Sequence, residues 1–287
     1  MKRCIVDLKG GLGNQLFQLA FAFRLARGEM ERLLLNINYY RHWDEHVGPV
    51  IQYLFPEIKR QFVDIYETPK GFARICLDHS PGEFIPDLLR FDQDVHFSGY
   101  FQNWLYLDEI YGSFRDLFLC HNGDAVNHVR SSLRRGCSAL VGVHVRRGDY
   151  MSFDYRARFG IVALADAERA LNIAKSQLRI EGSCIEPIKT LWISDDRSLF
   201  SDDCQDIAKL PHFDATDSRI NSVLRDFCVL ASSDALVITN STFGFWAGLF
   251  APAVQQVFMP MHWFRNHSVE SHLIKPPFFR VYANQLL

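Results

Sequence analysis

The second half of the chain alternates short apolar runs with segments of helical periodicity, and this alternation limits the possible folds more than any other feature. The apolar runs predict strands at Leu140–Val145, Thr190–Ile193, Ala235–Thr239 and Gln255–Met259, and the periodic segments predict helices at Leu164–Leu178, Asn221–Ala231 and Phe243–Phe250. Because helices and short connections separate consecutive strands, we expect the strands to run parallel. We therefore predict a doubly wound α/β domain in this half.

The first half opens with the same pattern and then loses it. The sequence predicts a strand at Cys4–Leu8, a glycine loop at Lys9–Gly13, a helix at Asn14–Arg27 that Gly28 ends, and a second strand at Leu33–Ile37. From Tyr39 to about Pro86 the poor periodicity indicates an irregular, aromatic-rich face, and a strand pattern returns at Val95–Phe101. The polar stretch His121–Gly136 predicts a domain boundary near Cys137. The predicted fold class is thus α/β, with two domains.

Charge and cysteine content exclude several classes of function. The formal net charge is -2, so no global field draws the chain to nucleic acid or to an anionic membrane, and any anion site must be local. The seven cysteines are scattered, odd in number and without a C-x-x-C pair, which predicts reduced thiols, a cytoplasmic location and no zinc site. The sequence shows neither a signal segment nor an apolar stretch long enough to span a bilayer. We expect a soluble protein that meets a membrane only by docking to it.

The stretch Val143–Tyr150, with the sequence VHVRRGDY, emerges at the carboxyl end of a predicted strand. Open α/β sheets bind their ligands there. Arg146 and Arg147 offer planar forks that can hold phosphate oxygens bidentately. Gly148 lets the chain turn sharply and lets a ligand approach the backbone. For an isolated Arg-Arg pair, the alternative is a solvated turn that follows a strand.

The stretch Asn240–Trp246, with the sequence NSTFGFW, follows another predicted strand directly. Ser241 and Thr242 at a helix start cap free N–H groups, and those groups form an anion site together with the helix dipole. A plain N-cap is the alternative. Two strand ends of one sheet that both present phosphate-binding groups favour a diphosphate. Asp226, in the preceding predicted helix, can accept two N–H groups of guanine if it faces the cleft, and is otherwise an exposed helical carboxylate.

Two further motifs each have a structural and a functional interpretation. The glycine loop Gly10–Gln15 lacks the lysine of a P-loop and the third glycine of a dinucleotide fingerprint. It is either a tight βα turn capped by Asn14 or a loop whose backbone at Gly13 approaches a ligand. Ser194-Asp195-Asp196 ends a strand, and is placed either for a site or in a solvated turn.

Five motifs occur in the order seen in α-1,2-fucosyltransferases of glycosyltransferase family 11, which this chain resembles over nearly its whole length. They are Gly10–Gln18, Gly99–Gln102, His144–Tyr150, Ser194–Asp196 and Asn240–Trp246, and the His-x-Arg-Arg-Gly-Asp-Tyr element is the most specific. The resemblance implies a GT-B fold, in which two Rossmann-like domains face a cleft. We expect an acceptor-side domain at 1–137 and a GDP-fucose-binding domain at 138–287. It also implies inversion at C1 of fucose and no required metal or other cofactor.

Residues that match the motifs take their expected roles from this similarity. Arg146 resembles the arginine that binds the β-phosphate, His144 a neighbour of the nucleotide, and Asp226 the aspartate that reads guanine. Asn14 matches an asparagine of the related O-fucosyl enzymes that lies close to the reaction centre. The expected donor-binding set is Gly13, Asn14, His144, Arg146, Arg147, Asp196, Asp226, Asn240, Ser241, Thr242 and Phe243. The chain departs from the His-Gly of bacterial members at Phe159–Gly160, so the acceptor contacts of that region are not carried over.

The implied reaction breaks the C1–O bond of GDP-fucose while negative charge builds on the departing β-phosphate. Arg146, Arg147 and the N–H groups of Ser241–Phe243 would stabilise that charge. Asp149 is the first candidate, and Asp154 the second, for the carboxylate that takes the acceptor proton, although either can instead only orient the arginines. The expected catalytic set is Arg146, Asp149, Asn14 and Asp154.

The acceptor that the resemblance implies is a galactose-terminated glycan. A bacterial O-antigen or lipo-oligosaccharide precursor would fit a cytoplasmic enzyme that meets a lipid-linked acceptor at the inner membrane. Three alternatives stay open: a fucosyltransferase of another linkage (α-1,6 or α-1,3), a metal-dependent transferase that uses the D-x-D of Asp92 and Asp94, and a GDP-binding module without catalysis. No nucleic-acid partner is expected, and the oligomeric state is not predicted.

Overall fold

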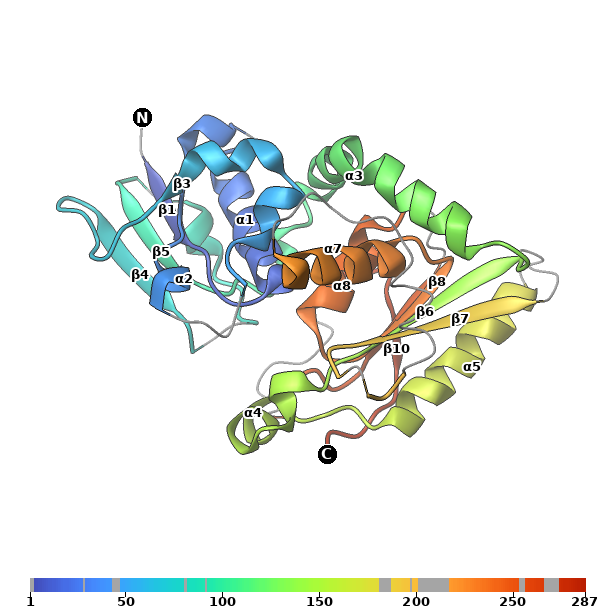
Figure 1. The fold of residues 1–287 in the computed structure, drawn as a ribbon. Helices are drawn as coiled ribbons and strands as arrows, with labels where there is room; N and C mark the ends of the chain where they lie inside the picture. The colour runs from blue at the N-terminus through green and yellow to red at the C-terminus, as the bar shows by residue number, and fades with distance from the viewer. Residues whose placement is uncertain are drawn as a thin grey trace. The chain divides into compact units, whose positions relative to one another are not determined.

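The computed structural model describes residues 3–27, 29–42, 47–79, 82–90, 92–180, 187–196, 198–200, 217–252, 256–265 and 274–287. The chain divides into two compact units, which are unit 1 (Met1–His121) and unit 2 (Asn122–Leu287). Figure 1 colours both in chain order from blue to red.

Unit 1 is built on a five-stranded parallel sheet. Its strands are β1 (Cys4–Asp7), β2 (Leu33–Asn36), β3 (Phe62–Val63), β4 (Ala73–Leu77) and β5 (Val95–Gly99), in the spatial order β3-β2-β1-β5-β4. All neighbouring pairs in this order run parallel. The chain moves from β1 to β2 on one side and places β5 on the other. The strand order therefore reverses between β1 and β5, which is a topological switch point.

Helix α1 (Leu12–Leu25) is apolar almost all round and is covered accordingly. Every residue from Leu12 to Phe23 except Asn14 is buried, as expected of a helix without a polar face. Phe21 stacks on Phe101 with ring centroids 3.9 Å apart and meets Phe97 of β5 edge-on at 5.2 Å. The predicted helix at Asn14–Arg27 is confirmed with an earlier start, and Gly28 lies outside the described residues.

The poorly periodic segment after β2 holds short turns rather than long elements. These are α2 (Tyr39–His42), η2 (Val50–Tyr53), η3 (Pro56–Gln61) and η4 (Pro86–Leu89), with η1 (Met30–Arg32) before β2 and η5 (Trp104–Tyr106) after β5. The sequence did not predict β3 and β4. No residue of β4 is fully buried. Its sequence therefore lacks the continuous apolar run that predicts a buried strand.

Helix α3 (Tyr111–Leu133) was not predicted, and it crosses the division between the two units. The predicted boundary near Cys137, with domains at 1–137 and 138–287, assumed a polar connection over His121–Gly136. The division lies instead at His121–Asn122, inside the helix. Arg130 in the second half of α3 donates to the Ser232 carbonyl at 2.8 Å and pairs with Asp234, which ties this half to unit 2.

Unit 2 also has a five-stranded parallel sheet. Its strands are β6 (Ala139–Val145), β7 (Ile188–Ser194), β8 (Ala235–Ile238), β9 (Gln256–Pro260) and β10 (Arg280–Tyr282), in the order β10-β9-β8-β6-β7. All neighbouring pairs are parallel. Counted within the unit the order is 2-1-3-4-5, one of the common doubly wound orders, and its switch point lies between β6 and β8. The four predicted strands are confirmed, although Gln255 lies outside the described residues, and β10 was not predicted.

The helices of unit 2 cover both faces of this sheet (Figure 1). They are η6 (Gly148–Met151), α4 (Phe153–Phe159), α5 (Leu164–Ile180), α7 (Ser218–Ala231) and α8 (Thr242–Phe250). Side chains along β6 alternate between the faces. Val141, Val143 and Val145 belong to the core formed with α5. Gly142 and His144 therefore point to the opposite face, where a Cβ on Gly142 would come within 2.6 Å of Ser233 Oγ.

Two parallel-sheet units in one chain confirm the predicted α/β class with two Rossmann-like domains. A cleft that both units face stays a prediction. Among the described residues, no helix combines the length and apolar character that a bilayer crossing needs. The described cysteines are free thiols, namely Cys4, Cys76, Cys120, Cys137 and Cys228; Cys184 and Cys204 lie outside the described residues.

Candidate functional site

The switch point of unit 2 brings the two main predicted motifs together. His144 at the end of β6 is in register with Ile238 at the end of β8, so the residues that follow these strands leave the sheet side by side. The backbone N–H of Arg146 donates to the Thr239 hydroxyl at 2.9 Å. This bond joins the arginine motif to the segment that starts α8.

Arg146 is held between two carboxylates. Its Nη2 lies 2.6 Å from Asp149 Oδ1, and its Nη1 lies 2.7 Å from Asp195 Oδ2. Burial lowers the pKa of the Arg146 guanidinium, but the charges of Asp195 and Asp149 outweigh it, and the net shift is upward. The guanidinium lies 5.4 Å from the centroid of the Tyr150 ring, a distance that allows a cation–π contact. Arg146 is therefore a fixed cation with a defined orientation.

Arg147 does not form a second fork beside Arg146. Its guanidinium donates to the carbonyls of Arg146 (2.8 Å) and Val162 (3.1 Å), and its backbone N–H donates to Asp195 Oδ1 at 2.7 Å. Burial lowers the pKa of Arg147. Gly148 has φ +20°, and a Cβ there would come within 2.4 Å of Asp195 Oδ2. The loop therefore closes over Asp195 only because residue 148 is a glycine.

The start of α8 supplies the second part of the site. Ser241 is the extended N-cap residue, is buried, and makes no side-chain capping bond. The first N–H groups of a helix have no partner within the helix and attract anions together with the helix dipole. A Cβ on Gly244 would come within 2.8 Å of Ile238 Cγ2 and 3.1 Å of His144 Nδ1. The first turn of α8 thus lies directly against β8 and His144.

His144 is a buried, neutral imidazole beside this helix start. It is 4% exposed, and its Nδ1 is buried without a hydrogen-bond partner among the described residues. Burial lowers its pKa to about 4; the Asp195 charge opposes this shift and the Arg146 charge adds to it. Its ring lies 5.3 Å from that of Phe243. An unpartnered buried ring nitrogen is unusual in a native core and suits a position that a ligand completes.

The other predicted residues of unit 2 occupy three kinds of position. Asp226 is buried in α7, and the adjacent Phe227 packs edge-on against Phe243 of α8 at 5.3 Å. The Asn240 amide donates to the carbonyls of Phe159, Gly160 and Trp263 at 3.1–3.3 Å, so this side chain fixes neighbouring loops.

Asp196 is half-buried beside Ser198, and Asp154 lies toward solvent. The Asp196 carboxylate accepts from the Ser198 hydroxyl at 2.6 Å, and the bonds from Ser198 lower its pKa. Asp154 is exposed on α4. The structure groups His144, Arg146, Arg147 and Asp149 with the start of α8, and it does not add Asp154 to this group among the contacts of the described residues.

Gly13 and Asn14 belong to unit 1, in the first turn of α1. Asn14 Oδ1 accepts from Gln102 Nε2 at 2.9 Å, and a Cβ on Gly10 would come within 2.6 Å of Asn14 Nδ2. Gly10 has φ +74°, so the glycine loop is a tight turn packed against Asn14. The role of Gly13 and Asn14 in donor binding stays a prediction.

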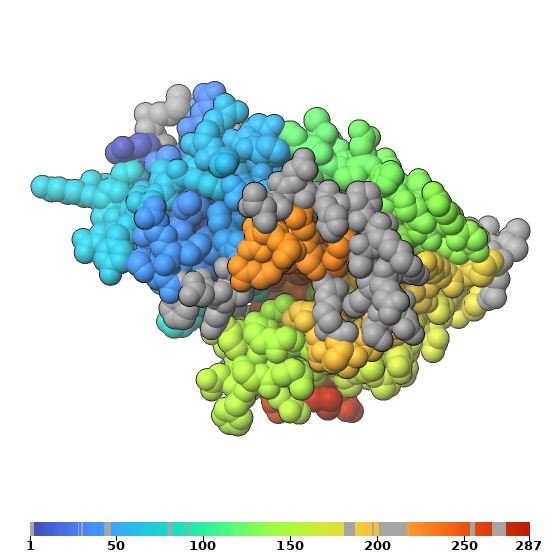
Figure 2. Space-filling model, viewed as in Figure 1, coloured from blue at the N-terminus to red at the C-terminus, as the bar shows by residue number. Residues whose placement is uncertain are grey.

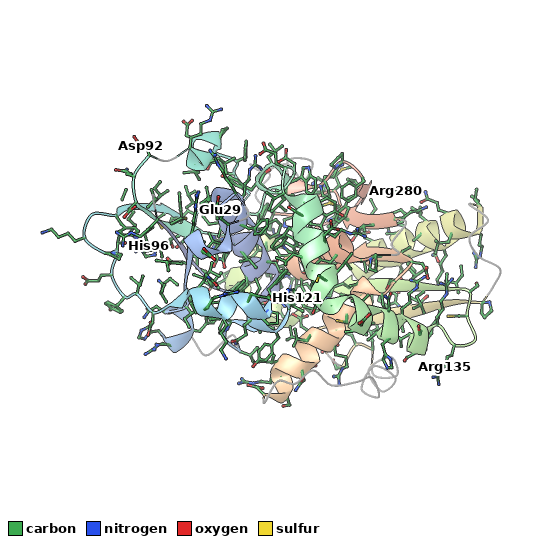
Figure 3. All side chains as sticks on the ribbon, turned by 90° about the horizontal axis from the view of Figure 1, so that it is seen from above. Glu29, Asp92, His96, His121, Arg135 and Arg280 are labelled. Atoms are coloured by element: carbon green, nitrogen blue, oxygen red, sulfur yellow. The ribbon has the colours of Figure 1, made fainter. Side chains whose placement is uncertain are left out.

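One carboxylate of the D-x-D motif, that of Asp94, is paired with an arginine. Asp94 accepts from the backbone N–H and the guanidinium of Arg3 at 2.7–2.9 Å, and these bonds lower its pKa. Asp92 lies on a loop outside the sheet that contains His96 (Figure 3). No group of three or more His, Cys, Asp or Glu side chains placed to hold a metal ion occurs in the described part of the chain.

Sequence reasoning missed three residues of this site. Asp195 holds Arg146 and Arg147, Thr239 receives the Arg146 N–H, and Gly244 makes room for His144. The signal for Asp195 was its place directly after a predicted strand, one residue before the predicted Asp196. Nothing in the sequence alone distinguishes which of the two carboxylates pairs with Arg146.

A doubly wound unit whose switch point carries a clamped arginine beside a helix start has the features with which such folds bind phosphate groups. The chain belongs to glycosyl transferase family 11, because the model of that family matches residues 89–256, more than half of the chain. This confirms the family predicted from the motifs.

Similar curated proteins carry related names. A mouse galactoside 2-alpha-L-fucosyltransferase Sec1 is 25% identical over 84% of this chain and 62% of its own length. An alpha-1,2-colitosyltransferase of Escherichia coli is 25% identical over 94% of this chain and 96% of its own length. The chain thus spans less than two thirds of the mouse relative. Among solved structures, the fucosyltransferase NodZ from Bradyrhizobium has a TM-score of 0.46 at 15% identity, covering 90% of this chain and 95% of NodZ.

Proposed function

We propose that this chain transfers L-fucose from GDP-β-L-fucose to the 2-hydroxyl of a terminal β-galactoside, with inversion at C1. One observation carries the proposal: the Arg146 loop and the start of α8 are joined at the switch point of unit 2 by the Arg146–Thr239 hydrogen bond of 2.9 Å. A guanidinium and a set of helix N–H groups at one edge match a diphosphate in charge and in hydrogen-bond donors.

The donor chemistry requires charge stabilisation more than proton transfer. The C1–O bond of the donor breaks, and its electron pair leaves with the β-phosphate of GDP. Arg146 and the first N–H groups of α8 stabilise the charge where it develops. Because Asp149 and Asp195 fix the guanidinium before the donor arrives, little reorganisation remains for the reaction step.

The nucleotide part of the donor is assigned to the face of the sheet that carries His144 and α7. Buried Asp226 suits the pair of N–H donors on the guanine edge. His144 is buried against Gly244 in the first turn of α8, so it supports the helix start. Since His144 is neutral over the physiological range, it adds no charge to the site.

Asp149 is the proposed proton acceptor for the galactoside hydroxyl, and Asp154 is the second candidate. The acceptor oxygen forms the new bond to C1 on the face opposite GDP, and its proton passes to the carboxylate. Asp149 pairs with Arg146, which fixes the position of its carboxylate. The transfer is assigned to the chain's own residues without a metal or other cofactor, which the engagement of Asp94 by Arg3 supports.

A second donor is favoured by one relative. The E. coli colitosyltransferase is matched over 96% of its length, so GDP-colitose is the alternative donor. Turnover with the two donors at equal concentration decides between them.

We also assign the chain to the cytoplasmic face of a membrane that holds a lipid-linked acceptor. Phe153 (86% exposed) and Met151 (57% exposed) stand on and beside α4, together with the exposed arginines Arg156, Arg158 and Arg265. The yellow-green segment that contains α4 lies at the surface in Figure 2. Aromatic and basic side chains together suit an anionic lipid surface.

Vesicle co-sedimentation tests this assignment. Wild-type protein should pellet with phosphatidylglycerol vesicles, and Phe153→Ser should reduce the bound fraction severalfold. Tyr66→Ser removes an equally exposed aromatic residue of unit 1 (78%) and should change nothing. Wild-type protein that stays in the supernatant contradicts the assignment.

The decisive experiment for the transfer is incubation with GDP-fucose and a panel of galactose-terminated oligosaccharides, in EDTA and without it. Product NMR should show an α-1,2 linkage, and EDTA should have no effect. An α-1,6 or α-1,3 product would overturn the linkage, and GDP binding without turnover would reduce the chain to a binding module.

A further inference from the structure

A backbone segment of unit 2, residues 159–162, contacts both halves of the proposed diphosphate site. We call it the linking segment; it begins at the last residue of α4 and ends before α5. Its Val162 carbonyl accepts from the guanidinium of Arg147 in the arginine motif at 3.1 Å. Its first two carbonyls accept from the side chain of Asn240, which directly precedes Ser241, the N-cap residue of α8. The arginine motif and the helix start therefore contact the same piece of backbone.

Asn240 is buried, and its side-chain N–H groups point at protein carbonyls. The residue is 2% exposed. Its Nδ2 donates to the carbonyls of Phe159 at 3.1 Å, Gly160 at 3.2 Å and Trp263 at 3.3 Å. A side-chain amide has two N–H donors, so both are directed at the protein. An asparagine in this place acts on a phosphate site through the backbone segments that it joins.

Arg147 forms the other end of the connection. Its Nη2 donates to the Val162 carbonyl, and its Nη1 donates to the carbonyl of Arg146 at 2.8 Å. One side chain thus holds both the linking segment and the backbone of the residue proposed to bind phosphate. Asp195 accepts from the Arg147 backbone N–H at 2.7 Å and pairs with Arg146 Nη1 at 2.7 Å. The backbone and the guanidinium of Arg146 are therefore fixed together.

The linking segment is also held by a short β-bridge. Val162 pairs antiparallel with Leu286, and Ile161 and Leu287 exchange backbone hydrogen bonds of 3.3 and 2.9 Å. Gly160 has φ +68°, a conformation that favours glycine, and a Cβ there would come within 2.7 Å of Leu286 Cβ. The position of the segment is therefore fixed by contacts outside the diphosphate site.

Two separate connections thus join the arginine motif to the start of α8. The first is the hydrogen bond of 2.9 Å from the Arg146 N–H to the Thr239 hydroxyl. The second runs from Arg147 through the linking segment to Asn240. A single hydrogen bond leaves its partners free to rotate about it, whereas a second connection fixes their relative orientation. Electrostatic stabilisation of a phosphate depends on such preorganised geometry.

We infer that Asn240 is a positioning residue of the diphosphate site. By holding the start of α8 on the linking segment, it sets the place of the first N–H groups of the helix relative to the Arg146 guanidinium. That the ligand is a diphosphate rests on the proposed function, whereas the coupling between the helix start and the arginine motif does not.

The test compares Asn240→Asp with Asn284→Asp in the full chain. Asn284 is a matched control, because it lies in the same unit, is 7% exposed, and donates through Nδ2 to the His262 carbonyl at 3.1 Å. Each change replaces the amide N–H donors with an oxygen. Asn240→Asp should raise the Kd for GDP roughly tenfold, which corresponds to the loss of about one hydrogen bond. Asn284→Asp should leave this Kd at its wild-type value.

Guanosine separates the positioning of phosphate groups from a general loss of structure, because it has no phosphate. Its Kd, measured by NMR titration, should be the same for the wild type and for both variants. An unchanged Kd for GDP in Asn240→Asp overturns the inference, and so does an equal rise of the Kd for GDP and for guanosine.

Hydrogen–deuterium exchange of the ligand-free chain tests the coupling without any nucleotide. Asn240→Asp should speed exchange in residues 145–148 and 241–247 together, and Asn284→Asp should speed it in neither. Faster exchange of Asn240→Asp in only one of the two segments, or in neither, overturns the coupling. A wild type that does not bind GDP would overturn the proposed function alone, because exchange still decides on the coupling.

Gly160→Ala disturbs the linking segment itself, and it decides the question if Asn240→Asp does not fold. The added Cβ meets Leu286, so the segment must shift. The Kd for GDP should rise severalfold while that for guanosine stays unchanged. Gly136→Ala is the control, because Gly136 also has a positive φ (+76°) but has open space around its Cβ position. Equal Kd values for GDP in the two glycine variants overturn the inference.

Discussion

The two sheets of this molecule place a paired cation at the same topological position and use it differently. In unit 2 the cation is Arg146, which two carboxylates from different strand ends hold at 2.6 and 2.7 Å. In unit 1 it is Lys9, which is more deeply buried and pairs with the one carboxylate of Asp78. Next to Arg146 lies a helix start, and next to Lys9 lie tyrosines.

The difference shows that strand topology fixes where a ligand can bind, while the local chemistry fixes which ligand. An arginine fork beside helix N–H groups is suited to phosphate oxygens. A lysine is a compact point charge without that fork. Three changes test whether unit 2 serves the donor alone, as this contrast requires, and a fourth tests the burial of His144 beside the site.

The largest effect is expected for Arg146→Ala. Loss of one preorganised donor to the departing phosphate typically costs about 3–4 kcal/mol of barrier, so kcat should fall by two to three orders of magnitude. Steady-state kinetics measures it. Arg24→Ala is the control, because Arg24 in unit 1 also lies between two carboxylates, Asp108 and Glu109. Near-normal turnover of Arg146→Ala would contradict a donor role for the carboxyl edge of the unit 2 sheet.

A stability effect of nearly the same size is expected from His144. Its pKa falls from 6.5 to about 4 on folding, so the unfolded chain takes up the proton first as the pH drops below 6.5. The free energy of unfolding should therefore decrease by about 3 kcal/mol between pH 6.5 and 4. Urea unfolding of His144→Gln should show a correspondingly weaker pH dependence. His128→Gln, at an exposed position of α3, should keep the wild-type dependence.

Asp195→Asn should have a moderate effect on turnover. The change removes one charge from the Arg146 clamp and weakens the bond to the Arg147 N–H, which together cost about 2 kcal/mol. We expect kcat to fall roughly thirtyfold, with a smaller change in KM for lactose. Asp217→Asn disrupts an exposed ion pair with Arg219 and serves as the control. A rise confined to KM for lactose would place Asp195 on the acceptor side.

The smallest effect is expected for Gly244→Ala. A Cβ there meets Ile238 and His144 at 2.8 and 3.1 Å, so the first turn of α8 must shift at a cost of about 1 kcal/mol. KM for GDP-fucose should rise severalfold. Gly248 lies in the same helix but away from His144, and a Cβ there would come within 3.0 Å of Val257 Cγ2. Gly248→Ala should lower stability similarly without changing that constant. Identical kinetics for the two variants would contradict the link between α8 and the donor.

Much of unit 2 could be predicted because three of its strand ends, those of β6, β7 and β8, carry their own motifs. The buried strand β8 is apolar throughout and β6 is apolar except for His144, and the polar residues that follow the two strands mark the site directly. The partners of Arg146 could be predicted only in part, because the pairing of Val145 with Ser194 across β6 and β7 brings Asp195 to the site. This register is a tertiary property.

Unit 1 could be predicted less well, because the polar residues at its strand ends are scattered single residues. Lys9, Tyr40 and Asp78 come from three different strand ends and form no motif. Helix α3 was missed for a related reason, since its polar composition resembles a connection. Phe114, Phe118, Val126, Val129 and Leu133 are its buried apolar positions. Their spacing of three, four and eight residues was the available signal.

Two carboxylates, Asp149 and Asp195, each contact one end of the Arg146 guanidinium. A guanidinium carries five N–H groups, so N–H groups remain for a phosphate while both ion pairs are kept. Because the carboxylates offset the charge of Arg146, ionic strength should weaken phosphate affinity less than it would for an unpaired arginine. Recognition at this edge then depends on the direction of the hydrogen-bond donors more than on net positive charge.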